Sequence, residues 1–374
     1  MTRAILFRLV SALGLTQIIS WGALYYSIAV LGASIRDELG LSAAALFGAY
    51  SLSLLLSALT APLAGRAIDR YGGRLVMSVG SITAALALFS IAHAHSAITL
   101  YAAWALAGIA MAMTLYDAAF ATLSQHAGTS YRTALTALTL MGGLASTAFW
   151  PLSLKGLEWF GWRDTLSAFA LLQIAICLPL HLAFISRTAT PIAPGRIGSE
   201  YEHGTLPPES RRPAFIALGA AFALNGFIVS ALTVHLITVL QGKGLTLESA
   251  VWVGAFFGPM QVTGRILEFT IGCRFSSRRI GMLSLWLLVG ALAVLIALHG
   301  DIVLALTLPS CSAAATASLL SFAGRFQQSS SVGPATAARS AAWQRRRCLP
   351  ARWRLSPSRR SRCRRRLRSG GCCC

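Results

Sequence analysis

Long apolar runs separated by short polar segments make up most of the chain. A bilayer core of about 30 Å is crossed by roughly 20 apolar residues in helical form, and nine runs reach about that length. They cover residues 11–31, 43–64, 75–94, 98–121, 134–154, 166–185, 214–236, 250–271 and 282–299, and a tenth begins at Ile302. The pattern predicts an all-α, polytopic helical membrane protein.

The longest polar segment between these runs divides the predicted helices into two sets. Residues 186–213 contain five prolines in addition to several charges, and six predicted helices precede them. Six helices, a polar linker and a second set of helices form the layout of a transporter with two halves. We therefore predict a six-helix N-terminal half (1–185), a cytoplasmic linker (186–213) and a partial C-terminal half (214–310). A helical receptor or a membrane enzyme shares this span count, so motifs must decide between them.

Basic residues in the loops predict the orientation, because cytoplasmic loops are rich in Lys and Arg. A cytoplasmic N-terminus places thirteen arginines in inner segments and leaves outside only Arg36, Lys155, Arg163 and Lys243. The first run is longer than the apolar part of a signal peptide, so we expect it to remain as a signal anchor. These features predict a multi-pass protein of the plasma membrane, the inner membrane in a bacterium.

Composition supports a membrane protein and separates the tail from the body. Hydrophobic residues make up 55% of the chain and charged residues 12%, against about 25% charged residues in soluble domains. An ordinary soluble enzyme is thereby excluded. The net charge of +20 divides unevenly, since residues 1–324 carry +6 while residues 325–374 hold 14 arginines, no lysine and no acid.

The composition of residues 311–374 is unlike that of a selected binding arm. A basic run raises nucleic acid or anionic lipid as partners, but the tail is rich in Cys and Ser and ends in three cysteines. We interpret residues 311–374 as out-of-frame translation beginning near 308–312, and expect no nucleic-acid binding. Most of helix ten and all of helices eleven and twelve would then be missing, which predicts impaired transport by the chain as written.

The strongest motif lies between the second and third runs, at residues 65–74 (GRAIDRYGGR). Gly65 is expected to allow close helix approach and Gly72 a tight turn, while Asp69 can accept backbone N–H bonds or pair with an arginine. Such a cluster, formed in one conformation and broken in another, would act as a latch. The alternative is a solvated turn whose arginines follow from the positive-inside rule.

This segment resembles the cytoplasmic loop motif G-x-x-x-D-R/K-x-G-R/K-R/K of the major facilitator superfamily. Gly65, Asp69, Arg70, Gly72 and Arg74 match, and Gly73 replaces one basic residue. The Phe160–Arg163 segment (FGWR) is also similar to a sequence common before the sixth helix there. The resemblance covers about residues 10–308 and implies the superfamily fold, with an intact N-terminal half, an incomplete C-terminal half and transport by alternating access. It departs from the drug/proton antiporter motif of the fifth helix.

Polar residues inside the runs are candidates for a central cavity. Gln17, Trp21 and Tyr25 recur at helical spacing, although aromatic residues also anchor helices at interfaces. Asn225 and Gln261 are weaker candidates, since a lone polar residue more often bonds a neighbouring helix. Our expected partners are a small-molecule substrate and the lipid bilayer, for a chain that acts as a monomer.

Three ionisable residues lie within runs, where charge is expensive and usually functional. Arg265 and Glu268 could pair at i and i+3; otherwise Arg265 would bind an anionic substrate. In the latter case the resemblance points to the monocarboxylate branch, an organic-anion porter with an arginine on helix eight. Asp117 could carry a coupling proton, and Glu268 is a second candidate for coupling. The position of Asp117 favours instead a structural bond to Arg132 or to the 65–74 loop.

Chemistry other than transport has little support in the sequence. No nucleotide-binding loop, metal-ligand spacing or nucleophile motif is present, and the histidines are scattered singly. We therefore expect no cofactor, no metal and no enzymatic activity. A membrane sensor would need a soluble output domain, for which the tail is the only candidate, and a pseudogene product remains the other alternative.

Overall fold

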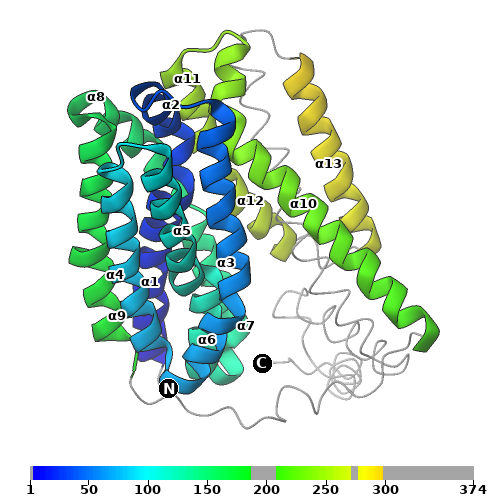
Figure 1. Cartoon of the computed structure of the whole chain (residues 1–374). Helices are drawn as coiled ribbons and strands as arrows, with labels where there is room; N and C mark the ends of the chain where they lie inside the picture. Colours follow the sequence, from blue (N-terminus) through cyan, green and yellow to red (C-terminus); the bar gives the residue numbers. More distant parts are fainter. Residues whose placement is uncertain (1–2, 187–207, 271–276, 298–374) are drawn as a thin grey trace, which may run out of the picture.

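The structure, a computed structural model, describes residues 3–186, 208–270 and 277–297, and over these residues it is helical throughout (Figure 1). Within them, five helical stretches are long and apolar enough to cross a membrane: Ala4–Glu38, Ala43–Tyr71, Gly73–Ala92, Ala97–Ala127 and Thr133–Phe184. A shorter apolar stretch covers Gly226–Gly242. The predicted all-α, polytopic fold is confirmed.

The first stretch is one long, locally widened helix. It consists of α1 (Arg3–Trp21), a π-helical turn (Gly22–Tyr26) and α2 (Ile28–Glu38), and so extends beyond the predicted 11–31 at both ends. A Cβ at Gly22 would lie 2.0 Å from the Phe149 ring. The absence of a side chain at Gly22 therefore lets the widened turn pack directly against the fifth span.

The second and third stretches are α3 (Ala43–Tyr71) and α4 (Gly73–Ala92). Ser42 begins α3, because its side chain accepts a hydrogen bond from the amide of Ala45 at 3.1 Å. Gly72 alone separates the two helices, with φ of +83°. This left-handed conformation is readily adopted by glycine and strained for other residues, so the chain reverses there within one residue.

The fourth stretch is broken into α5 (Ala97–Thr114) and α6 (Tyr116–Ala127). A capping box formed by Ser96 and Thr99 begins α5. Leu115 interrupts the helix with extended backbone angles (φ −80°, ψ −165°). The break leaves helical carbonyls near the middle of the span without their usual partners.

The fifth and sixth spans are joined with little interruption. They comprise α7 (Tyr131–Gly142), α8 (Ala145–Leu172), a second π-helical turn (Gln173–Cys177) and α9 (Leu178–Phe184). Gly161 bends α8 sharply with φ of +79°. The stretch therefore crosses twice, as the predicted runs 134–154 and 166–185 require.

The remaining described helices are α10 (Pro208–Gly242), α11 (Leu247–Ala255), α12 (Phe257–Thr270) and α13 (Ser277–Ala297). α10 begins at Pro208, within the predicted linker, so residues 208–213 are helical. The tenth predicted span and the 311–374 tail lie outside the described residues, and their interpretation stays a prediction.

Two packing features fix the first six spans, here called the N-terminal bundle (residues 3–184). A Cβ at Gly108 of α5 would lie 2.3 Å from the backbone oxygen of Ser53 in α3, so these helices touch backbone to backbone. The indoles of Trp104 and Trp150 fill the space between helices and are almost completely buried. We call the end of this bundle that holds the N-terminus and the 65–74 loop the N-terminal face, and the other end the opposite face.

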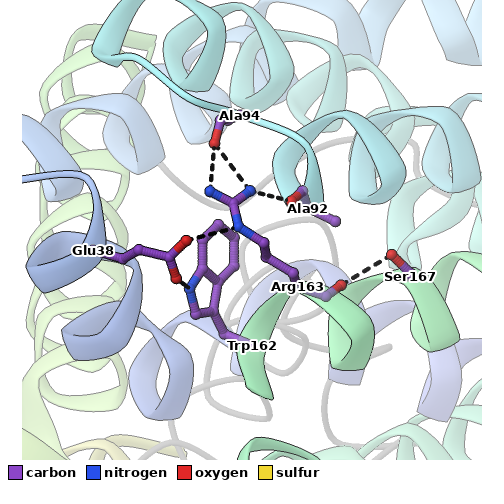
Figure 2. A network of polar contacts seen from close by, with 6 residues as sticks. All are labelled: Glu38, Ala92, Ala94, Trp162, Arg163 and Ser167. Atoms are coloured by element: carbon purple, nitrogen blue, oxygen red, sulfur yellow. Dashed lines mark hydrogen bonds and ion pairs between the residues drawn. The ribbon is translucent and has the colours of Figure 1, made fainter. Parts of the chain in front are cut away.

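At the opposite face, Arg163 ties three helix ends together (Figure 2). Its guanidinium donates to the carbonyls of Ala92 and Ala94 at the end of α4, and to the carboxylate of Glu38 at the end of α2. The indole of Trp162 donates to the other oxygen of the same carboxylate. The positive φ at Gly161 turns this pair of side chains toward α2 and α4, which gives the FGWR segment a structural role.

Candidate functional site

A continuous group of aromatic side chains lines the widened turn of the first span. The Trp21 ring lies 5.0 Å from that of Tyr25 and 5.1 Å from that of Tyr116 in α6. Tyr116 in turn stacks on Phe120 with ring centroids 5.2 Å apart. All four side chains are partly exposed. We call Trp21, Tyr25, Tyr116 and Phe120 the aromatic wall.

The predicted cavity residue Gln17 lies below this wall and is fully buried. Its Nε2 donates a 2.7 Å hydrogen bond to the carbonyl of Thr114, the last residue of α5. The amide thus satisfies a carbonyl that the break at Leu115 exposes. Within the described part of the chain, Gln17 Oε1 and Trp21 Nε1 are both buried without a hydrogen-bond partner.

Three contacts join the N-terminal bundle to α10 and α11 toward the opposite face. Tyr25 donates to the hydroxyl of Ser230 in α10 at 3.0 Å, and the Phe47 ring lies 4.4 Å from that of His235. Thr147 of α8 donates to the carbonyl of Ala255 in α11 at 2.8 Å. We call these three contacts the opposite-face gate.

Toward the N-terminal face, α10 separates from the N-terminal bundle. Between Pro208 and Phe227, every side chain that the structure describes in α10 is exposed, whereas Thr233, Val234, Leu236 and Ile237 are buried. Figure 1 shows α10 leaning away from the bundle along this length. The N-terminal bundle and α10 therefore meet near one face and diverge toward the other.

The 65–74 loop is exposed at the N-terminal face. The side chain of Asp69 is exposed, and no ion pair of it occurs among the described residues. The guanidinium of Arg70 lies over the Tyr71 ring, 5.3 Å from its centroid. In this conformation the motif therefore makes no ion pair to another described residue.

One expectation for this motif is wrong. Gly65 was expected to allow close helix approach, but a Cβ there would meet no atom of the described residues within 4 Å. The close approach is instead at Gly73, where a Cβ would lie 2.1 Å from Oγ1 of Thr122 in α6. This contact explains why a glycine stands where the family motif has a basic residue.

Asp117 does not form the expected bond to the 65–74 loop. It lies in the first turn of α6 with its side chain exposed, and it makes no hydrogen bond or ion pair within the described part of the structure. The side chain of Arg132, the other expected partner, lies outside the described residues.

The other predicted site residues are only partly described. Gln261 of α12 is half-buried, with Oε1 3.4 Å from the position of a Cβ at Gly143 in the fifth span. Asn225 lies in α10, and Arg265 and Glu268 lie in α12, but their side chains are outside the described residues. The described residues hold no group of three or more metal-ligating side chains.

Comparison with known proteins now identifies the fold. A family model described as Major Facilitator Superfamily matches residues 13–345. The chain belongs to this superfamily. The match continues past residue 308, where we expected the resemblance to end. No curated protein is similar enough in sequence to count as a relative.

Solved structures of transporters have the same fold as this chain. A bacterial homolog of the human lysosomal transporter Spinster, in an inward-facing and occupied conformation, has a TM-score of 0.65 at 18% identity over 92% of this chain and 78% of that chain. The nucleoside transporter NupG gives 0.68 at 16% identity, covering 91% and 86%. The D-xylose–proton symporter gives 0.66 at 12% identity, covering 85% and 80%. At such identities the likeness shows the fold alone.

The superfamily and its fold establish a multi-pass membrane protein of transmembrane transport. Sequence reasoning did not anticipate Tyr116, Phe120 and Ser230 as parts of the site. Tyr116 and Phe120 could have been found from their i, i+4 spacing beside Asp117. Ser230 carried no signal, because its role depends on where α10 crosses the first span.

Proposed function

We propose that this chain is a secondary transporter that moves a small molecule by alternating access and is held here with its N-terminal face open. The single observation that carries the proposal is the one-sided contact between α10 and the N-terminal bundle. Near the opposite face, the bundle is hydrogen-bonded to Ser230 of α10 and to Ala255 of α11. In contrast, the described side chains of α10 from Pro208 to Phe227 are exposed.

The bias of basic residues makes the N-terminal face cytoplasmic. The proposed location is therefore the plasma membrane, inner in a bacterium, with an inward-facing conformation. In this conformation the aromatic wall is reached from the cytoplasm and closed from the other side by the opposite-face gate. In the second conformation the gate opens, and the 65–74 latch closes.

A distance measurement tests the proposal without knowledge of the substrate. In a variant without native cysteines, spin labels at Arg66→Cys and Ala217→Cys report on the N-terminal face. We expect two distance populations, of which the longer corresponds to the present structure. Locking the gate with a Phe47→Cys/His235→Cys disulfide should remove the shorter population, and reduction should restore it. A single distance that is insensitive to the lock would contradict alternating access.

A further inference from the structure

Asp117 is a carboxylate placed deep in a span, with no counter-charge among the described residues. It lies ten residues from the end of the fourth apolar stretch at Ala127, which corresponds to about 15 Å along a helix. Its side chain is exposed, and no basic group of the described residues pairs with it. A carboxylate at this depth is costly unless a cation or a proton compensates it.

The aromatic wall lies directly beside this carboxylate. Asp117 follows Tyr116 and precedes Phe120 by three residues, so Asp117 and Phe120 are neighbours on the surface of α6. Tyr116 extends the wall to Trp21 of the first span, with rings 5.1 Å apart. Aromatic faces attract cations through their electron density and stack on planar rings.

The wall faces the helices that move in the proposed cycle. Tyr25 stands one helical turn from Trp21 and hydrogen-bonds Ser230 of α10, so this side of the first span faces α10. From Tyr25 the wall continues through Trp21 to Tyr116 and Phe120. It therefore lies where the bundle and α10 diverge.

Two buried polar atoms at the Gln17 end of the aromatic wall have no hydrogen-bond partner among the described residues. Gln17 is fully buried and held against Thr114 at the α5–α6 break, yet its Oε1 has no partner among the described residues. The same holds for the buried Nε1 of Trp21, one turn further along. Buried polar atoms are normally satisfied, so an acceptor and a donor left open here indicate a place for a ligand's polar group.

We propose that Asp117 and the aromatic wall bind an organic cation that carries a planar ring. Its ammonium or ring nitrogen pairs with the Asp117 carboxylate, its ring packs against Trp21, Tyr116 and Phe120, and a polar substituent reaches Gln17. A coupling proton alone would not require the aromatic wall. The proposal rests on the proposed transport function and names the substrate class of the same site, which differs from the organic anion that Arg265 suggested.

Binding to the purified full-length chain tests this assignment. The probe is methylphenylpyridinium, a planar cation, compared by calorimetry with uncharged phenylpyridine at mildly alkaline pH and with biphenylcarboxylate. We expect the cation to bind most tightly. Asp117→Asn should weaken cation binding about tenfold or more, since a desolvated charge pair is lost, and should leave the uncharged probe unaffected, which also shows that the variant is folded.

Two further variants make the test specific. Asp164→Asn removes an exposed carboxylate at the opposite face and should change no affinity. Trp21→Leu should weaken both the charged and the uncharged ring. Equal binding of all three probes, tighter binding of the anion, or unchanged cation affinity in Asp117→Asn would overturn the proposal. If Asp117→Asn removed only the pH dependence of phenylpyridine binding, that result would also overturn the proposal. It would assign Asp117 to proton coupling. The spin-label distances do not depend on these results.

Discussion

The guanidinium of Arg163 and the carboxylate of Glu38 join the sixth span to the first, with Nε 2.9 Å from Oε1 (Figure 2). The two residues are 125 positions apart in the chain. Because Arg163 also donates to the carbonyls that end α4, one side chain fixes three helix ends at the opposite face. The opposite-face gate is built on the same end of the bundle.

Removing this guanidinium should destabilise the bundle. Arg163→Ala leaves the carbonyls of Ala92 and Ala94 without this donor and the Glu38 carboxylate with only the Trp162 indole, so we expect the free energy of unfolding to fall by about 1–3 kcal/mol. Arg163→Lys should recover part of the loss, since it keeps the charge but not the forked geometry. Reversible unfolding in mixed micelles measures both.

The matched control is Arg36→Ala, which breaks an exposed pair between adjacent residues, with side chains 39% and 67% exposed. The decrease in the free energy of unfolding of this variant should stay below about 1 kcal/mol. Equal losses for Arg36→Ala and Arg163→Ala would show that the three-helix contact has no special weight.

Gly108 should tolerate no side chain. A Cβ there would lie 2.3 Å from the Ser53 oxygen, and backbone atoms cannot move aside as a flexible side chain can. Gly108→Ala should therefore force α3 and α5 apart and destabilise the bundle by about 1–3 kcal/mol. At Gly290 a Cβ would meet no described atom within 4 Å, so Gly290→Ala should be neutral or slightly stabilising because alanine favours helix. Thermal unfolding of the two variants compares them directly.

These contacts show which features the sequence could predict. Helix number and span positions follow from apolar runs, because a membrane requires about 20 apolar residues per crossing. Packing partners do not follow, since a glycine looks the same in the sequence whether its neighbour is backbone, as at Gly108, or open space, as at Gly65. Likewise, Glu38 and Arg163 become partners only when the first and sixth spans lie side by side.

For the candidate site, the sequence predicted single positions but not their arrangement. The spacing of Gln17, Trp21 and Tyr25 placed them on one face of a helix. That Gln17 is used to satisfy the carbonyl of Thr114 depends on the break at Leu115, a residue with no breaker character. The position of the aromatic wall opposite α10 depends on how the helices pack, and no local sequence pattern predicts it.

Restoring the family's basic residue at position 73 should harm this protein. Gly73→Arg or Gly73→Ala places a Cβ 2.1 Å from Thr122 Oγ1, so we expect a loss of about 1–3 kcal/mol in unfolding free energy. Adding Thr122→Ala removes the hydroxyl and the methyl group and should recover part of the loss. Gly65→Ala, in the same motif but with nothing within 4 Å, is the control and should be tolerated. A harmful Gly65→Ala together with a neutral Gly73→Ala would reverse the assignment of the close approach.

Asp69 should matter only in the conformation that this structure does not show. Its side chain is exposed and unpaired among the described residues, so with the gate locked by the Phe47→Cys/His235→Cys disulfide, Asp69→Asn should change the unfolding free energy by less than about 0.5 kcal/mol. In the unlocked protein, Asp69→Asn removes the carboxylate that the proposed latched conformation uses. The spin-label populations at the N-terminal face should then shift toward the open state by on the order of 1 kcal/mol, several-fold in ratio.

Asp164→Asn, at the opposite face, is the charge-matched control for this shift. Populations that respond equally to Asp69→Asn and Asp164→Asn would reduce the 65–74 motif to a solvated turn. A response limited to Asp69→Asn would make it a latch, because a substitution can move a conformational equilibrium only if the residue interacts differently with the two states.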